Sequence, residues 1–333
     1  MFGTLLESVG KDTTSKWLTL IRAPAVVFWV IGAFTWWLAH PDVDVRAWLR
    51  REDAVTLLAL LVVAAALLIG TSVLMDQLAR PLLRLLEGYW PPWLWLRPFR
   101  IRLIARAIDR QREWYGEWRR LDDSRPAATA ASGPTPTPSK EVAASAISDH
   151  RQVVLDQLVH EFPADEVSTM PTRVGNILRS SETYPKERYG LDAVIVWPAL
   201  WLVLPETTRD ALGVCRRSLD QSVSVVVALA ATLVWLPWSW LVLIPAVLGP
   251  PVVHQVFVIP RAQAFAQVVR ASFDIHRLAV YTSLRFPTPT DPDAEPTAGA
   301  HLTSYLWRGF SPQGLTFTPA SPEPPPPAGS GPL

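Results

Sequence analysis

Closely spaced acidic and basic side chains occur in one segment of the chain, Pro171 to Pro205, which reads PTRVGNILRSSETYPKERYGLDAVIVWPALWLVLP. The segment holds the only asparagine of the chain, and the polar residues that we single out in it are Arg173, Asn176, Glu182, Glu187, Arg188 and Asp192. Carboxylates grouped in this way can serve as general acids or bases. Arginines are interleaved with them, which is typical of ion pairs, so we expect a buried or half-buried polar clamp in which Arg188 and Asp192 are candidate partners.

The rest of the sequence offers little further chemistry. Six histidines are scattered without the paired spacing of metal ligands, and we expect neither a metal nor another cofactor. Ser180 and Ser181 do not lie in a strand-turn-helix elbow, and no glycine-rich phosphate loop occurs. His254 lies in an apolar stretch, where an imidazole can relay protons, although a single local hydrogen bond is its commoner role.

Three long apolar stretches are expected to form the helices that hold this polar segment in place. Ala23 to Pro41 and Ala54 to Met75 contain about 19 and 22 residues without a charge, enough for one membrane crossing each. The uncharged stretch from Gln221 to Pro260 would form a helix of about 60 Å, twice the thickness of a hydrocarbon core. It must therefore fold back, and Leu236-Pro237-Trp238-Ser239 supplies the turn. We expect an all-α integral membrane protein with four transmembrane helices in two hairpins, 23–75 and 221–260.

Arginine residues predict the orientation of these helices. Between Leu74 and Arg125 lie Arg80, Arg84, Arg97, Arg100, Arg102, Arg106, Arg110, Arg112, Arg119 and Arg120. Positive loops stay in the cytoplasm, so both chain termini and a helical cap are expected there, in a bacterial inner membrane. The loop from Pro41 to Asp53 mixes both signs of charge, and the turn around Pro237 carries none, so both suit the outside.

The remaining segments define the expected domain organisation. A helix that begins at Pro205-Glu206 should run without a break into the third span, whereas the apolar run Ala193 to Leu204 is too short to cross and suits a buried or interfacial position. Outside the two hairpins we expect a cytoplasmic N-terminus (1–22), interfacial and amphipathic helices (76–121), a Pro/Ala/Thr linker (122–140), a helical region with the charged segment (141–220), an amphipathic helix (261–286), and a mostly disordered tail (287–333) with an apolar docking island at 302–310.

Tryptophan and arginine side chains follow the second span and favour the lipid headgroup layer. The residues concerned are Trp90, Trp93, Trp95, Arg97 and Arg100. They form either a simple elbow or a site for anionic lipids. The expected partners are the lipid bilayer, anionic lipids, and a second copy of the chain or an unidentified protein. Nucleic acid is not expected, although the net charge of +1 by itself says nothing about partners.

Four short motifs carry a resemblance to known sequences. Glu187-Arg188-Tyr189-Gly190-Leu191-Asp192 forms an ERYG-x-D element that is followed by Trp197-Pro198, and a late Tyr305-Leu306-Trp307-Arg308-Gly309 lies near the end. Together with Glu87 to Pro91 and Asp274 to Arg277, they resemble an uncharacterised family of bacterial multi-pass membrane proteins. The resemblance implies a shared four-span architecture and brings no activity, cofactor or catalytic residue.

We therefore expect a non-enzymatic inner-membrane scaffold, sensor or effector subunit. The alternative is an oligomeric channel or transporter, and a membrane-embedded enzyme comes third. Transport through the bundle would usually place charged side chains at the middle of the membrane, and the apolar stretches contain none.

Overall fold

A computed structural model describes residues 23–90, 97–131, 139–309 and 315–318, and every regular element in these ranges is helical. The α-helices are α2 (Ala23–Ala39), α3 (Val45–Arg51), α4 (Ala54–Glu87), α5 (Arg97–Ala131), α6 (Ser139–His160), α7 (Arg173–Tyr189), α8 (Ala193–Val203), α9 (Glu206–Ala231), α10 (Leu243–Val253), α11 (Ile259–Ser283) and α12 (Glu295–Arg308). Short 3-10 turns are η1 (Glu166–Ser168), η2 (Thr232–Trp235) and η3 (Trp240–Val242), and η4 (His254–Val258) is one π-helical turn.

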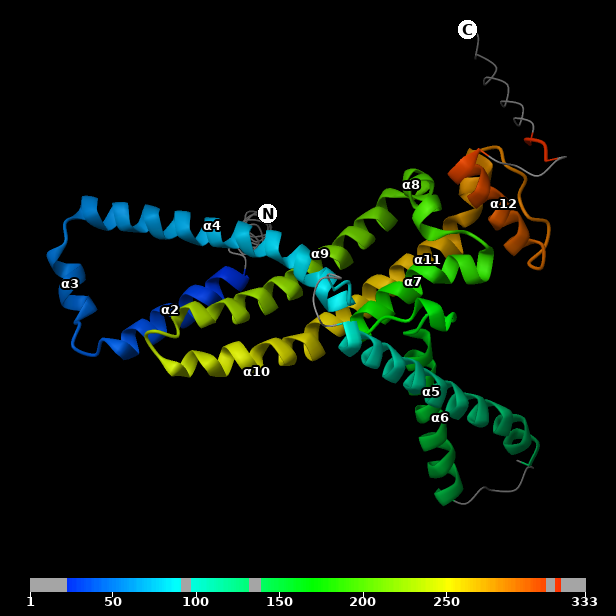
Figure 1. The fold of residues 1–333 in the computed structure, drawn as a ribbon, viewed down its shortest axis with the longest axis horizontal. Coiled ribbons are helices and arrows are strands. Elements are labelled where there is room, and N and C mark those ends of the chain that lie inside the picture. Colours follow the sequence, from blue (N-terminus) through cyan, green and yellow to red (C-terminus); the bar gives the residue numbers. More distant parts are fainter. Residues whose placement is uncertain (1–22, 91–96, 132–138, 310–314, 319–333) are drawn as a thin grey trace, which may run out of the picture.

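Helices α2, α4, α9 and α10 lie side by side in one half of the molecule, which we call the bundle (Figure 1). At one end of the bundle, α3 connects α2 to α4, and the turn between α9 and α10 lies at the same end. The turn predicted at 236–239 is confirmed. Three helical segments are long and apolar enough to cross a membrane, namely Ala54–Glu87, Glu206–Trp235 and Trp240–Ser283. Helix α2 is apolar but shorter, at 17 residues or about 26 Å.

Helix α4 continues well beyond the end that the sequence predicts. We expected it to stop at Met75 and to be followed by an interfacial elbow, but it runs to Glu87 with Pro81 inside it. Packing explains the extension, because Ala79 and Leu83 of the added turns are buried in a core with α7, α9 and α11. The helix ends at Gly88, whose φ of 96° lies in the left-handed region that glycine tolerates.

Helices α5 and α6 form a pair that projects from the rest of the molecule (Figure 1). Polar contacts join them: Arg151 forms a two-pronged ion pair with Glu117 at 2.8 Å, the Trp118 indole donates to Asp156 at 2.6 Å, and the Gln152 amide donates to Asp122 at 3.4 Å. Helix α5 extends to Ala131, so the predicted linker at 122–140 is wrong for its first ten residues. The high helix propensity of the alanines at 127–131 accounts for this. Residues 132–138 lie outside the described ranges.

The half of the molecule that lies away from α3 is a helical cap. It consists of α5 to α8, α12, and the ends of α9 and α11 that pack on these helices. Helix α9 begins directly after Pro205 and enters the bundle without a break, as predicted. Helix α10 likewise continues through η4 into α11. Helix α7 lies at the centre of the cap, where Val174 and Ile177 are fully buried against α4, α9 and α11.

Helix α12 corrects the prediction of a mostly disordered tail from residue 287. The expected docking island at 302–310 belongs to this helix up to Arg308, and Leu302 is fully buried in a core with α7, α8 and α11. Two glycines permit the contact. A Cβ at Gly299 would lie 1.9 Å from the carbonyl oxygen of Tyr189, and one at Gly190 would lie 1.9 Å from that of Pro296. The island thus finds its partner within the chain, while the segment from residue 319 lies outside the described ranges.

Candidate functional site

The charged segment at 171–205 does not form one cluster, and its first part belongs to a buried ion pair. Glu161, which follows α6, is 4% exposed and accepts two hydrogen bonds of 2.7 Å from the Arg173 guanidinium. This bonding raises the pKa of Arg173. The Gln263 amide of α11 donates to the same carboxylate. Three segments of the chain therefore meet at Glu161.

Two further predicted residues have local structural roles. Asn176 is 2% exposed, accepts from the Met170 backbone N–H at 2.7 Å and donates to the Met170 carbonyl at 3.1 Å. It closes the loop that leads into α7. Glu182 forms an exposed ion pair with Arg179, one helical turn away, at 3.0 Å. Both sets of contacts are typical of structure and not of acid-base chemistry.

Glu187, Arg188 and Asp192 are engaged separately. Glu187 accepts from the Ala164 N–H at 3.2 Å, and the Arg188 guanidinium donates to the Tyr184 hydroxyl at 3.2 Å. Asp192 caps α8 by accepting from the Val194 N–H at 3.0 Å. Arg188 and Asp192, which were candidate partners, therefore bind different groups in the described contacts.

A polar cluster that was not predicted from the sequence joins α7, α11 and α12. Asp274 accepts hydrogen bonds from the hydroxyls of Tyr184 and Tyr189 at 2.9 and 2.6 Å. The Arg277 guanidinium lies 4.0 Å from the centre of the Tyr189 ring and forms an ion pair with Glu295 at 2.6 Å. Burial, followed by the bond to Asp274, raises the pKa of Tyr189. The cluster fixes α12 on α7, and it places the Asp274-to-Arg277 motif beside the ERYG-x-D element.

Three of the predicted lipid-interface residues lie at the end of α4 and the start of α5, namely Trp90, Arg97 and Arg100. The Trp90 ring stacks on Phe99 with 5.9 Å between the ring centres, and its indole donates to the Leu85 carbonyl at 2.9 Å. Arg97 is exposed and Arg100 is half-buried at the start of α5. Trp93 and Trp95 lie outside the described residues. This junction stays a candidate interface for lipid headgroups.

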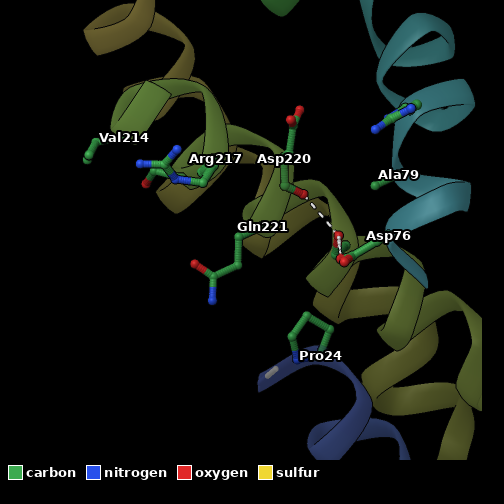
Figure 2. Close-up of a pocket in the computed structure, with 10 residues that line it drawn as sticks. Pro24, Asp76, Ala79, Val214, Arg217, Asp220 and Gln221 are labelled. Carbon is green, nitrogen blue, oxygen red and sulfur yellow. Dashed lines mark hydrogen bonds between the residues drawn. The ribbon is translucent and has the colours of Figure 1, made fainter. Parts of the chain in front are cut away.

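A cavity of about 630 Å³ lies between the start of α2, the last third of α4 and the middle of α9. Figure 2 shows Asp76 on α4 facing α9, from which Arg217, Asp220 and Gln221 project in different directions. The Ser224 hydroxyl lies 3.3 Å from the Asp76 carboxylate and 3.0 Å from the Asp220 carbonyl, so it can donate to either. The polar side chains of the lining are Asp76, Arg80, Arg217, Ser218, Asp220, Gln221 and Ser224.

One signal in the sequence could have located this cavity. Asp76 is the first charged residue after one apolar stretch, and Asp220 is the last charged residue before another. Each lies at the end of an uncharged stretch, but residues so far apart in sequence give no indication that they line the same cavity. Within the described residues, no group of three or more His, Cys, Asp or Glu side chains could hold a metal ion.

The three long apolar helices indicate an all-helical, membrane-embedded protein. Comparison with known proteins adds no name to this class: no family model, no curated protein and no solved structure matches the chain. The function is therefore argued from the geometry of this chain.

Proposed function

We propose that the protein is a four-span scaffold of the bacterial inner membrane, whose cytoplasmic cap binds a protein partner through α8. Helix α2 would serve as the fourth span, which makes two hairpins of α2 with α4 and α9 with α10. Its packing supports this role: Trp29 of α2 donates to Thr71 of α4 at 3.1 Å, and a Cβ at Gly32 would lie 2.5 Å from the Trp235 ring. The arginine excess lies on the cap side, which favours a cytoplasmic cap.

One face of α8 carries the proposal. Val194 and Leu202 are 71% and 80% exposed, and Trp201 lies beside Leu202 at 37%. Residues 194, 198, 201 and 202 share one face of a helix, and all four are exposed. Val196 and Leu200 on the other face are fully buried. Helix α8 is thus fixed to the cap by one side and presents an apolar stripe on the other.

Lipid is a poor explanation for this stripe. Helix α8 precedes Glu206, where α9 begins, and 15 residues separate Glu206 from the start of the uncharged stretch at Gln221. At about 1.5 Å per residue, α8 lies about 22 Å along α9 from the membrane boundary. An apolar stripe exposed to water at that distance is typical of a surface that binds protein.

Site-specific photo-cross-linking in cells tests the proposal. A photoreactive residue at Leu202 is expected to give a discrete adduct. A photoreactive residue at Trp201 should give an adduct as well, and the double variant Val194→Ser, Leu202→Ser should abolish that adduct. The matched control is Val167→Ser, because Val167 is a lone apolar residue of the cap that is 91% exposed. Neither variant should alter yield, since exposed substitutions change the free energy of unfolding by about 0.5 kcal/mol or less.

The cross-linked species also separates the alternatives. Adducts between two copies of this chain would make α8 a homo-oligomer contact, and the absence of any adduct at three positions of α8 would refute the scaffold. Ion flux through liposomes that contain the purified protein would instead support the channel or transporter alternative.

A further inference from the structure

We propose that the end of α4 and the start of α5 together bind an anionic phospholipid of the cap-side leaflet, whose phosphate is held by Arg84, Arg97 and Arg100. This inference is independent of the partner surface on α8, because it needs only that the long apolar helices lie in a bilayer.

The level of the bilayer along α9 and α11 supports the first step. The Arg261 guanidinium of α11 donates to the Ser218 carbonyl of α9 at 3.1 Å, and Arg261 is the first charged residue after the uncharged stretch. Ser218 lies 20 residues before Trp238 in the turn at the other end, which is about 30 Å at 1.5 Å per residue and matches the thickness of a hydrocarbon core. Ser218 and Arg261 therefore mark the boundary of the hydrocarbon on the cap side.

The same boundary can be placed on α4, which runs toward the cap while α9 runs away from it (Figure 1). The Ser224 hydroxyl lies 3.3 Å from the Asp76 carboxylate, so these two residues share one level, and Ser218 lies six residues nearer the cap. Six residues beyond Asp76 on α4 is Leu82. The last turn of α4, residues 84–87, then lies about 3 to 7.5 Å past the boundary, and the headgroup layer adds about 5 to 7 Å on each side of the hydrocarbon. Helix α4 therefore ends at the depth of lipid headgroups.

Direct contacts hold the start of α5 at the same depth. The Trp90 ring stacks on Phe99 with 5.9 Å between the ring centres, and the Tyr89 N–H donates to the Arg84 carbonyl at 2.9 Å. Phe99 and Tyr89 are both exposed. Exposed aromatic rings beside arginines are typical of the layer between hydrocarbon and water.

Three arginines at this place have no anionic partner among the described residues. Arg84 and Arg97 are exposed and Arg100 is half-buried. None of their guanidinium groups forms an ion pair or a hydrogen bond in the described part of the chain, and the Nε of Arg100 is buried without an acceptor there. Three guanidinium groups can therefore donate to an anion from outside the chain.

The neighbouring carboxylates do not cancel this positive charge. Glu87 is the only acid that the sequence places among these arginines; it is half-buried and interacts with Arg216 of α9 as well as with Arg84. Glu182 of α7, which also interacts with Glu87, is paired with Arg179 at 3.0 Å. The excess of positive charge favours an anionic headgroup over one that carries its own cation.

The surrounding apolar surface favours a lipid over a free phosphate. Leu78 and Leu85 of α4 are exposed next to Arg84 and on the hydrocarbon side of it. An acyl chain can lie on these leucines while the phosphate meets the arginines, whereas a soluble anion would leave the leucines uncovered.

Native mass spectrometry of the full-length protein tests the proposal. The protein is released from micelles that contain equal amounts of phosphatidylglycerol and phosphatidylcholine with identical acyl chains. We expect phosphatidylglycerol to be retained at least about fivefold more than phosphatidylcholine, because an arginine near an anionic headgroup contributes about fivefold to binding.

Conservative variants test the arginines. The double variant Arg84→Gln, Arg97→Gln should weaken the retention of phosphatidylglycerol about 25-fold and leave phosphatidylcholine unchanged. Arg84→Lys, which keeps the charge, should retain the preference. The matched control is Arg120→Gln, because Arg120 is exposed on α5 but lies 20 residues, or about 30 Å, from Arg100. None of these changes should alter the melting temperature, which shows that the variants are folded.

Three results would overturn the proposal. Equal retention of the two lipids would show that the place has no preference for an anion, and an equal loss in Arg120→Gln would show that only the overall charge matters. Displacement of phosphatidylglycerol by millimolar glycerol phosphate would assign the arginines to a soluble phosphate instead of a lipid.

Discussion

Replacing Arg173 with alanine should destabilise the protein far more than any other removal of a charge from α7. The carboxylate of Glu161 would stay 4% exposed while losing two hydrogen bonds of 2.7 Å and its only ion pair among the described contacts. Breaking a buried pair costs about 3 to 5 kcal/mol. The lower value applies here, because the Arg173 side chain is 41% exposed and water can reach the vacated space.

A loss of about 3 kcal/mol corresponds to roughly a hundredfold change in the folding equilibrium. For chains of 150 to 250 residues each kcal/mol lowers the melting temperature by about 2 to 4 °C, and the effect decreases with length, so we expect about 6 °C here. The matched control is Arg179→Ala on the same helix. It removes an exposed pair with Glu182, at 3.0 Å, whose contribution is below about 1 kcal/mol.

The assay is unfolding of the purified protein in detergent, followed by circular dichroism. A double-mutant cycle adds Glu161→Gln, which removes the charge but keeps an acceptor for Gln263. Arg173→Ala should cost less in that background than alone, by about 0.5 to 3 kcal/mol. Equal losses for Arg173→Ala and Arg179→Ala, or additivity in the cycle, would refute the reasoning that this pair is a buried clamp.

Three further predictions follow from the same structure. Gly299→Ala should release α12 and increase its proteolysis, since the new Cβ would lie 1.9 Å from a carbonyl oxygen, whereas Gly116→Ala, with no atom within 4 Å, should be neutral or slightly stabilising. Because the pKa of Tyr189 is raised, the folded protein keeps a proton that the unfolded chain loses near pH 10, and the free energy of unfolding therefore falls as the pH rises above about 10. Tyr189→Phe should make this fall shallower in unfolding curves at alkaline pH. An unchanged slope would contradict the prediction. A reporter that is active only outside the cytoplasm should work when fused at Ser239 and fail at Ala130, and activity at Ala130 would reverse the orientation.

Local features of the sequence determined the class of the protein. The length of an uncharged run sets whether a helix can cross a bilayer, and this needs no knowledge of other segments. The turn at 236–239 and the start of α9 after Pro205 were predictable for the same reason, because proline acts on its own backbone. The sequence did not predict where some helices end, or that α12 forms at all. Helix α4 gains its last turns from buried contacts of Ala79 and Leu83, and α12 forms around the buried Leu302.

The candidate sites depended on tertiary structure. The sequence predicted a polar site within 171–205, but the carboxylate that Arg173 binds lies before that segment, at Glu161. The two tyrosines of the segment meet Asp274, 85 and 90 residues away, and Asp76 meets Ser224 at a separation of 148 residues. Many carboxylates in the chain are chemically equivalent partners for a given donor. Only the packing of α7 against α4, α9, α11 and α12 selects among them, since it decides which polar groups are buried together and must satisfy one another.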